Sequence, residues 1–280
     1  MLKGFSISVI GASHVEKEVV CQDASLYYPG ESYSIAIVSD GHGSSKHFRS
    51  HKGSEIAVKA ARDALVELLE KDEYIERLLA NHDKTLRQLE ENIIYRWNEA
   101  VEQDWQENPP SDDELTVFGD KEVKKSAVYG ATLIAAVMTE RYWFAIQIGD
   151  GECITILDDE NAEIFIEPDD RLVFGFTTSL CDSNANENFR HYFSKISEEN
   201  PKPRAIIVST DGIADSFTPE GFLKFNTEIF KNFVSQDNTL EELEKYLPEL
   251  SAKGSKDDVS IAGIYWLDGD TDRRERQSCL

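Results

Sequence analysis

The chain has 280 residues, of which 40% are hydrophobic and 10% aromatic, so it can bury a sizeable core. Its 29 basic and 53 acidic residues give a net charge of -24 at pH 7. A field of that sign repels nucleic-acid backbones and anionic membrane surfaces, so we expect neither as a partner. An anionic substrate would have to be neutralised locally, and a bound cation is the obvious device.

In the first half of the chain, strand-type patterns come first and helical patterns follow them. FSISVI (5–10) and SIAIVS (34–39) show the alternation of strands. From Gly53 to about residue 70, apolar residues recur on one helical face, and a second helical pattern runs from Ile75 to Val101. The polar stretch 106–115 then predicts an exposed loop.

The second half returns to short apolar segments. ATLIAAVM, RYWFAIQIG and ECITIL are separated by tight breaks, which predicts an antiparallel meander. The segment 168–203 has no clear period and predicts an irregular, flap-like excursion. Beyond it, RAIIVST (204–210) and VSIAGIYWL (259–267) predict buried strands.

The last predicted helix, TLEELEKYLPEL (239–250), is expected to end at its proline. Residues 268–280 form a polar C-terminal tail that we expect to fray. Strands and helices are segregated rather than alternating, which favours an α+β fold over a doubly wound sheet.

The four cysteines lie far apart and show no C-x-x-C spacing, which argues against a zinc site and against a disulfide scaffold. They are Cys21, Cys153, Cys181 and Cys279. The first residues lack the apolar run of a signal peptide, and no window has the length of a membrane-spanning helix, so a cytoplasmic location is expected. Cys21 has no basic partner specified nearby and is interpreted as a small buried hydrophobe rather than a nucleophile.

Acidic residues with glycine neighbours follow three of the predicted strands. They are Asp40-Gly41, Asp150-Gly151 and Asp211-Gly212. One such pair is an ordinary turn, and Asp268-Gly269 serves as an internal control to which we assign no function. With Asp23 near the first strand and Asp257-Asp258 before the last, the set supplies several carboxylates that a sheet could gather at one end. Converging carboxylates repel unless they share hard cations, and oxygen-only ligands suit magnesium or manganese.

Six segments stand in an order that identifies a family resemblance. They are QDAS (22–25), SDGHG (39–43), GATL (130–133), GDG (149–151), STDGIAD (209–215) and GSKDDVS (254–260). Together they resemble the metal-dependent Ser/Thr protein phosphatases of type 2C, the PPM family, and most closely its compact bacterial branch. The resemblance implies a four-layer αββα sandwich, in which two antiparallel β-sheets pack face to face with helices on both outer faces. It also implies one phosphatase domain over residues 1–267, followed by the tail at 268–280.

The resemblance further implies which residues hold metal ions. Asp40 matches the aspartate that bridges two core ions, and Gly41 would contribute its backbone carbonyl. Asp211 and Asp257 match the other carboxylates of the first ion, and Asp150 matches the acid that supports a third, weaker ion in many members. The implied cofactor is Mn²⁺ or Mg²⁺.

The implied reaction is hydrolysis of phosphoserine and phosphothreonine on proteins by a water activated between two divalent cations, without a covalent intermediate. Asp23 matches an acid that holds metal-bound water, and His42 matches the histidine proposed as general acid. The implied partner is a phosphorylated protein, such as a partner Ser/Thr kinase or its targets, in bacterial signalling. His47 and His51 are assigned to the entry of the first helix rather than to the metal site.

The chain departs from the family pattern in one important place. Many members carry an arginine about five residues before the first aspartate, where it clamps the substrate phosphate. Here that position is Glu18, and no arginine occurs between Met1 and Arg49. His14 and Lys17 are the nearest cationic candidates for the phosphate. The departure leaves an alternative open, a catalytically weak or inactive type-2C-like module that binds phosphoproteins or a regulatory partner.

Overall fold

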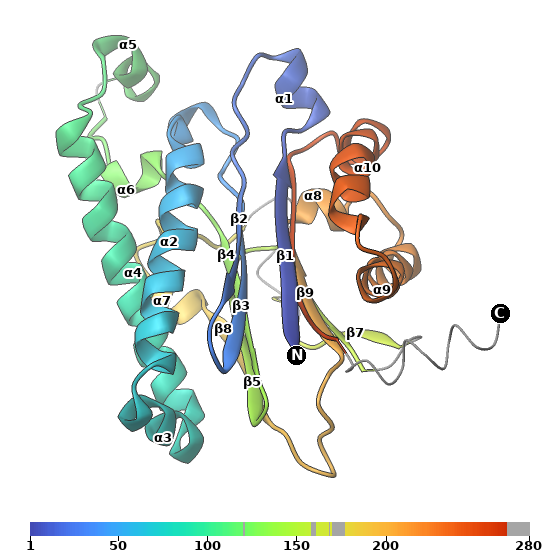
Figure 1. The fold of residues 1–280 in the computed structure, drawn as a ribbon. Helices are drawn as coiled ribbons and strands as arrows, with labels where there is room; N and C mark the ends of the chain where they lie inside the picture. The colour runs from blue at the N-terminus through green and yellow to red at the C-terminus, as the bar shows by residue number, and fades with distance from the viewer. Residues whose placement is uncertain (120, 158–160, 168, 170–176, 268–280) are drawn as a thin grey trace.

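Two β-sheets form the centre of the computed structural model, which describes residues 1–119, 121–157, 161–167, 169 and 177–267 (Figure 1). Within those residues every strand pairing is antiparallel, and each sheet has five strands. No helix in the same residues is both long enough and apolar enough to cross a membrane.

The strands of the two sheets are drawn from both halves of the chain. The first sheet runs, in spatial order, β1 (Leu2–Val9), β10 (Val259–Trp266), β9 (Ala205–Ser209), β6 (Glu152–Ile156) and β7 (Ala162–Ile164). The second sheet runs β2 (Ala24–Pro29), β3 (Tyr33–Ser39), β4 (Leu133–Thr139), β5 (Tyr142–Ile148) and β8 (Arg190–Lys195).

Helices cover the outer face of each sheet (Figure 1). α2 (Ser50–Leu69) and α4 (His82–Glu107) pack on the second sheet, and α9 (Pro219–Ser235) and α10 (Thr239–Lys253) pack on the first. The shorter helices are α1 (Ala12–Glu16), η1 (Ser45–His47), α3 (Asp72–Ala80), α5 (Asp112–Leu115), η2 (Thr116–Phe118), α6 (Lys125–Val128), α7 (Ala185–Asn188) and α8 (Asp211–Ala214). The predicted α+β fold with two antiparallel sheets between helical layers is therefore confirmed.

The core consists of three layers because successive strand residues point to opposite faces of a sheet. In β3, Ile35 and Ile37 face the helices on the second sheet, whereas Ala36 and Val38 join the core between the sheets. Both faces are covered, so β3, β4, β5, β9 and β10 are buried along their whole length. This explains why these strands are almost continuously apolar in the sequence.

Three sequence-based expectations about strands and loops are corrected. β6 does not continue a meander from β4 and β5, because it pairs with β9 and β7 in the other sheet. The segment 168–203 is not irregular throughout, because it contains α7 and the edge strand β8, which pairs with β5. Within that segment, residues 168 and 170–176 lie outside the described residues, as does the tail at 268–280.

The expected loop at 106–115 begins inside α4 and ends in α5, whose capping box joins Ser111 and Glu114.

The helix boundaries also differ from expectation. The long helical pattern from Ile75 is divided at Asn81, whose side chain accepts a hydrogen bond from the backbone N–H of Lys84 and caps α4. α10 continues through Pro248 to Lys253. The proline costs a backbone hydrogen bond, but Leu247 and Leu250 on either side are buried in the core beneath the helix. Tertiary packing here outweighs the local preference of proline.

α2 and the segment that enters β4 approach each other closely at Gly53. A Cβ atom at this position would overlap the carbonyl oxygen of Tyr129. The carbonyl oxygen of Gly53 also accepts a hydrogen bond of 3.0 Å from the indole of Trp97, which is fully buried. Glycine is therefore required here by packing, near the start of α2, although glycine has a low helix propensity.

We expect Gly53→Ala to lower the free energy of unfolding by about 1–3 kcal/mol, the usual range for overpacking a core. Helix propensity alone predicts the opposite sign, a gain of about 1 kcal/mol for alanine. Gly221→Ala in α9 is the matched control, since the nearest atom to its new Cβ is the Thr218 hydroxyl at 3.1 Å. Denaturant unfolding of both variants measures the difference, and a stabilised Gly53→Ala would contradict this account of the contact.

Candidate metal centre

Three aspartates from three strand ends meet between the two sheets. Asp40 follows β3, Asp150 follows β5, and Asp211 is the first residue of α8, directly after β9 and Thr210. Each offers a carboxylate oxygen, and these oxygens all lie within 4.8 Å of one another. The prediction that the sheets gather these strand-end acids is confirmed for this group, which we call the three-acid cluster.

The backbone around the cluster is held by neighbouring segments. The N–H of Asp40 donates a 3.0 Å hydrogen bond to the Thr132 hydroxyl, and the N–H of Thr132 donates one of 2.8 Å to the Asp40 carbonyl. Thr132 belongs to the GATL segment, so that motif acts by holding Asp40. A Cβ at Gly41 would lie 2.5 Å from the carbonyl oxygen of Gln22 and 2.7 Å from that of Ser50. Packing alone therefore requires glycine after Asp40.

The electrostatics of the cluster are those of half-buried like charges. Burial, followed by the charges of Asp23 and Asp211, raises the pKa of Asp40 well above its ordinary value. Burial and then the charge of Asp150 raise the pKa of Asp211 to about 6. Burial is also the main cause of the raised pKa of Asp150. Each carboxylate thus opposes ionisation of its neighbours.

Asp23 lies next to the cluster, directly before β2. It is buried, and its carboxylate accepts a 2.8 Å hydrogen bond from the Thr210 hydroxyl. Burial, followed by the charge of Asp258, raises its pKa well above the ordinary value. Asp23 is therefore close enough to Asp40 and Asp211 to interact with their charges, although it is outside the three-acid cluster.

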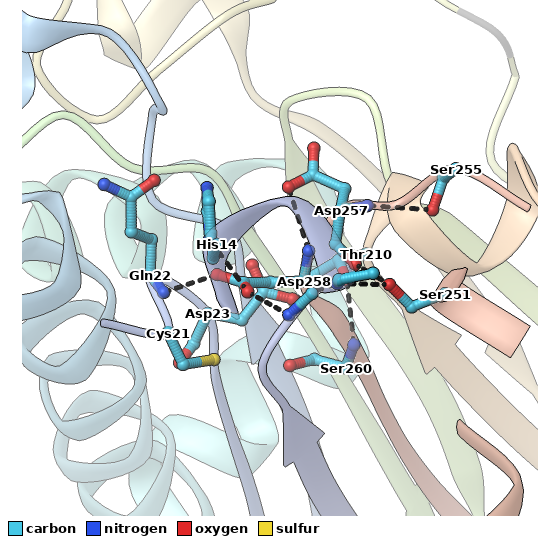
Figure 2. A network of polar contacts seen from close by, with 12 residues as sticks. His14, Cys21, Gln22, Asp23, Thr210, Ser251, Ser255, Asp257, Asp258 and Ser260 are labelled. Carbon is cyan, nitrogen blue, oxygen red and sulfur yellow. Dashed lines mark hydrogen bonds and ion pairs between the residues drawn. The ribbon is translucent and has the colours of Figure 1, made fainter. Parts of the chain in front are cut away.

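The two acids before β10 have different environments (Figure 2). Asp257 is exposed and lies outside the three-acid cluster, but its charge contributes to the raised pKa of Asp211. Asp258 is buried and points away from solvent. Asp215, which was not among the predicted site residues, adds a further negative charge that raises the pKa of Asp150 and Asp211. Its place in the STDGIAD segment, four residues after Asp211, was the available signal.

His42 lies just beyond Asp40 and is largely buried. Its ring meets the ring of His47 edge to face, with 4.8 Å between centroids. Burial, followed by the charge of His47, lowers the pKa of His42 to about 4. His47 lies in η1 before α2, as expected from the sequence, and its Nδ1 contacts the carbonyl oxygen of Ala127.

The two cationic candidates for the phosphate occupy different positions. His14 is buried in α1, and its Nδ1 lies 2.9 Å from Oδ1 of Asp258, so the imidazole faces Asp258 (Figure 2). Lys17 is exposed at the end of α1. Cys21 is half-buried, and burial raises the pKa of its thiol, which opposes formation of a nucleophilic thiolate.

The donors present fit a hard divalent cation. All side chains of the three-acid cluster offer oxygen, which Mg²⁺ and Mn²⁺ prefer over the nitrogen and sulfur of zinc sites. Oδ1 of Asp211 is buried and has no hydrogen-bond partner among the described residues. A buried carboxylate oxygen without a partner is costly, and a cation shared by the cluster would both satisfy it and remove the repulsion.

One family model matches most of the chain, and several solved structures share its fold. The family model described as Protein phosphatase 2C matches residues 10–248. No curated protein sequence matches the chain. Among solved structures, the serine/threonine phosphatase Stp1 from Staphylococcus aureus is 15% identical, with a TM-score of 0.59 over 96% of this chain and 96% of that chain.

Two further solved structures show the same fold. The S. agalactiae serine/threonine phosphatase is 15% identical, with a TM-score of 0.59 over 96% of this chain and 100% of that chain. The catalytic domain of the serine/threonine protein phosphatase PstP, solved with 2 manganese ions, is 17% identical, with a TM-score of 0.54 over 95% of this chain and 99% of that chain.

Removal of one charge from the cluster should stabilise the metal-free protein. The pKa of Asp211 is about 6 in the folded chain, above its ordinary value of 3.8. The folded state then binds more protons than the unfolded state between those values, so this carboxylate lowers stability as pH rises through them. At pH 7.5 in EDTA we expect Asp211→Asn to have a higher melting temperature than wild type. At 1.36 kcal/mol per pKa unit, the gain in unfolding free energy is at most about 3 kcal/mol.

The stability difference between Asp211→Asn and wild type should shrink towards pH 4.5, where Asp211 of the wild type is protonated in the folded state. Thermal melts at several pH values measure this difference, and Asp63→Asn, at an exposed position, is the control for loss of one surface charge. An Asp211→Asn variant that melts below wild type at pH 7.5 would show that the carboxylate stabilises the metal-free fold.

Proposed function

The chain belongs to the protein phosphatase 2C family, and from that membership we propose that it hydrolyses phosphoserine and phosphothreonine on proteins in a metal-dependent reaction. The observation that carries the proposal is the three-acid cluster of Asp40, Asp150 and Asp211. A pure binding module has little reason to keep half-buried, mutually repelling acids whose pKa values are raised. A metal-assisted hydrolase requires such a set.

We assign the proposed metal ligands by combining the family pattern with the geometry. Asp40 would serve both core ions, and the Gly41 carbonyl would contribute a further oxygen. Asp211 and Asp257 would serve the first ion, and Asp150 a third. Mn²⁺ and Mg²⁺ both suit these oxygen donors, and the related PstP domain was solved with 2 manganese ions. When bound, the ions supply an activated water as nucleophile and positive charge for the phosphoryl oxygens.

The remaining site residues would orient groups and move a proton. Asp23, held by the Thr210 hydroxyl, has acceptor oxygens next to the cluster and would orient water there. His42 would protonate the leaving serine or threonine oxygen. Its pKa of about 4 leaves it neutral at pH 7 in the free protein, and a phosphate dianion next to the ring would raise that pKa. The proton is then taken up together with the substrate.

The proposed substrate is a phosphorylated protein, such as a partner Ser/Thr kinase or its targets, in cytoplasmic bacterial signalling. One observation favours a second candidate, a weak or inactive module that binds phosphoproteins. The position of the usual phosphate-binding arginine is Glu18, and His14 faces Asp258. A turnover assay separates the two candidates, because an inactive module gives no metal-dependent turnover and a weak one gives little.

We expect metal-dependent hydrolysis of p-nitrophenyl phosphate and of a phosphothreonine peptide. EDTA should abolish turnover, added Mn²⁺ should restore it, and Asp40→Asn should lower kcat by about 10³-fold or more, since this carboxylate is assigned to both core ions. Asp63→Asn, far from the cluster in sequence and exposed, is the control. Equal rates for wild type and Asp40→Asn, or rates that EDTA leaves unchanged, would contradict the enzyme proposal.

The role of His42 depends on the leaving group. A serine or threonine alkoxide needs a proton as it leaves, whereas p-nitrophenolate does not. His42→Gln should therefore lower kcat for the phosphopeptide by about 10²-fold or more while changing kcat for p-nitrophenyl phosphate far less. His82→Gln, an exposed histidine at the start of α4, is the control. Equal losses on both substrates would remove the general-acid role.

A further inference from the structure

Asp258 is a buried acid next to the proposed metal centre, but it is not one of the proposed metal ligands. Its side chain is 2% exposed, whereas the adjacent Asp257 is exposed. Figure 2 shows Asp258 at the middle of a network of polar contacts that joins the segment around α1 to the turn before β10. A buried carboxylate is costly unless its oxygens are satisfied, so its partners indicate what it does.

The two oxygens of Asp258 reach both ends of the segment between β1 and β2. Oδ1 accepts a 2.6 Å hydrogen bond from the backbone N–H of Gly11, where that segment begins. Oδ2 accepts a 2.6 Å hydrogen bond from the N–H of Gln22, the residue before Asp23. Nδ1 of His14 lies 2.9 Å from Oδ1, outside the angle of a hydrogen bond but at ion-pair distance. One carboxylate thus faces three nitrogen atoms.

Further contacts fix the same turn against α1. The Ser251 hydroxyl accepts a 3.0 Å hydrogen bond from the N–H of Ala12 and donates one of 2.8 Å to the carbonyl oxygen of Asp257. The N–H of Ser13 donates a 2.9 Å bond to the carbonyl oxygen of Lys256. Gly11 packs so tightly on the Asp257–Asp258 peptide that a Cβ would overlap it. Lys256 has a positive φ of 67°, which only a well-supported turn sustains.

The contacts at Gln22 continue towards the cluster. Its carbonyl oxygen accepts a 2.5 Å hydrogen bond from the Ser54 hydroxyl in α2 and lies against Gly41. Asp258 is therefore one residue from Asp257 along the chain and, through Gln22, one residue from Asp23. These two acids are separated by most of the sequence, and Asp258 connects their backbones through a single side chain.

We propose that Asp258 is a positioning residue, which holds Asp257 and Asp23 in register at the metal centre, with His14 as its partner. The inference rests on the proposed metal centre. His14 then supports the site from behind and does not contact the substrate phosphate. An amide in place of Asp258 would offer one acceptor oxygen and one NH₂ group, and the latter would face a backbone N–H instead of accepting from it.

Isothermal titration of Mn²⁺ into the full chain tests the proposal. We expect Asp258→Asn to weaken Mn²⁺ affinity by about 10–100-fold, the usual effect of removing a group that orients metal ligands. Glu90→Gln is the matched control, because Glu90 is also a buried acid paired with a histidine, with 2.7 Å to Nδ1 of His191, between α4 and β8. It should lower the melting temperature in EDTA and leave Mn²⁺ affinity within about twofold of wild type.

A milder pair of variants covers the case in which Asp258→Asn fails to fold. His14→Ala keeps both backbone bonds of Asp258 and should weaken Mn²⁺ affinity several-fold. His14→Asn, whose Nδ2 can take the place of the imidazole Nδ1 but carries no positive charge, should restore it in part. Recovery with the conservative variant is not expected if His14 acts merely by filling space.

The outcomes separate this inference from the proposed function. Wild-type Mn²⁺ affinity in both Asp258→Asn and His14→Ala would overturn the positioning role while leaving the phosphatase proposal intact. A wild-type chain that binds no Mn²⁺ would overturn both. An increased KM for phosphopeptide with unchanged Mn²⁺ affinity in His14→Ala would instead assign His14 to the substrate phosphate, and the inference would be wrong.

Discussion

Half-buried carboxylates facing one another are the constraint around which this fold is arranged. Asp40, Asp150 and Asp211 each follow a buried strand, so their backbones are held by sheet hydrogen bonds and cannot separate to relieve repulsion. Burial and mutual repulsion raise their pKa values, which means that the metal-free site opposes folding at neutral pH. The apolar layers on both sides of each sheet must offset this cost. A divalent cation would convert the same repulsion into binding energy.

The strand-end acids could be predicted from the sequence because an apolar run that ends in Asp-Gly identifies both the strand and the turn. The sheet to which β6 belongs could not be predicted, because ECITIL is mainly apolar on both faces and would fit either sheet. The prediction that the last helix ends at Pro248 was wrong for a related reason. α10 stays intact because Leu247 and Leu250 are buried, and the local sequence does not show that burial. α9 was missed although its signals were present, with Thr218 as N-cap and Pro219 in the first turn.

The supporting contacts of the site were beyond sequence reasoning because they join distant residues through backbone groups. Asp258 accepts from Gln22, 236 positions away, and a backbone N–H carries no residue-specific signal. GSKDDVS therefore identified two adjacent acids but not their different roles, one exposed and one buried. His14 was considered for the phosphate because it is the nearest cation in the sequence, whereas in the fold its imidazole faces Asp258.

The absence of the usual arginine at Glu18 has a physical consequence for how an anion can be bound. Arg49 is held on the helical layer by the carbonyl oxygen of Asn108 and the hydroxyl of Tyr129, at 2.6 and 3.0 Å. Arg190 donates to the Gly149 carbonyl at 2.7 Å, next to Asp150, and Lys124 donates to the Cys181 carbonyl at 2.6 Å. These cations already have structural partners, and the net charge of -24 repels an approaching phosphate. In the proposed phosphatase, neutralisation of the phosphate would then depend more heavily on ions held at the three-acid cluster, so their affinity would govern substrate binding as well as catalysis.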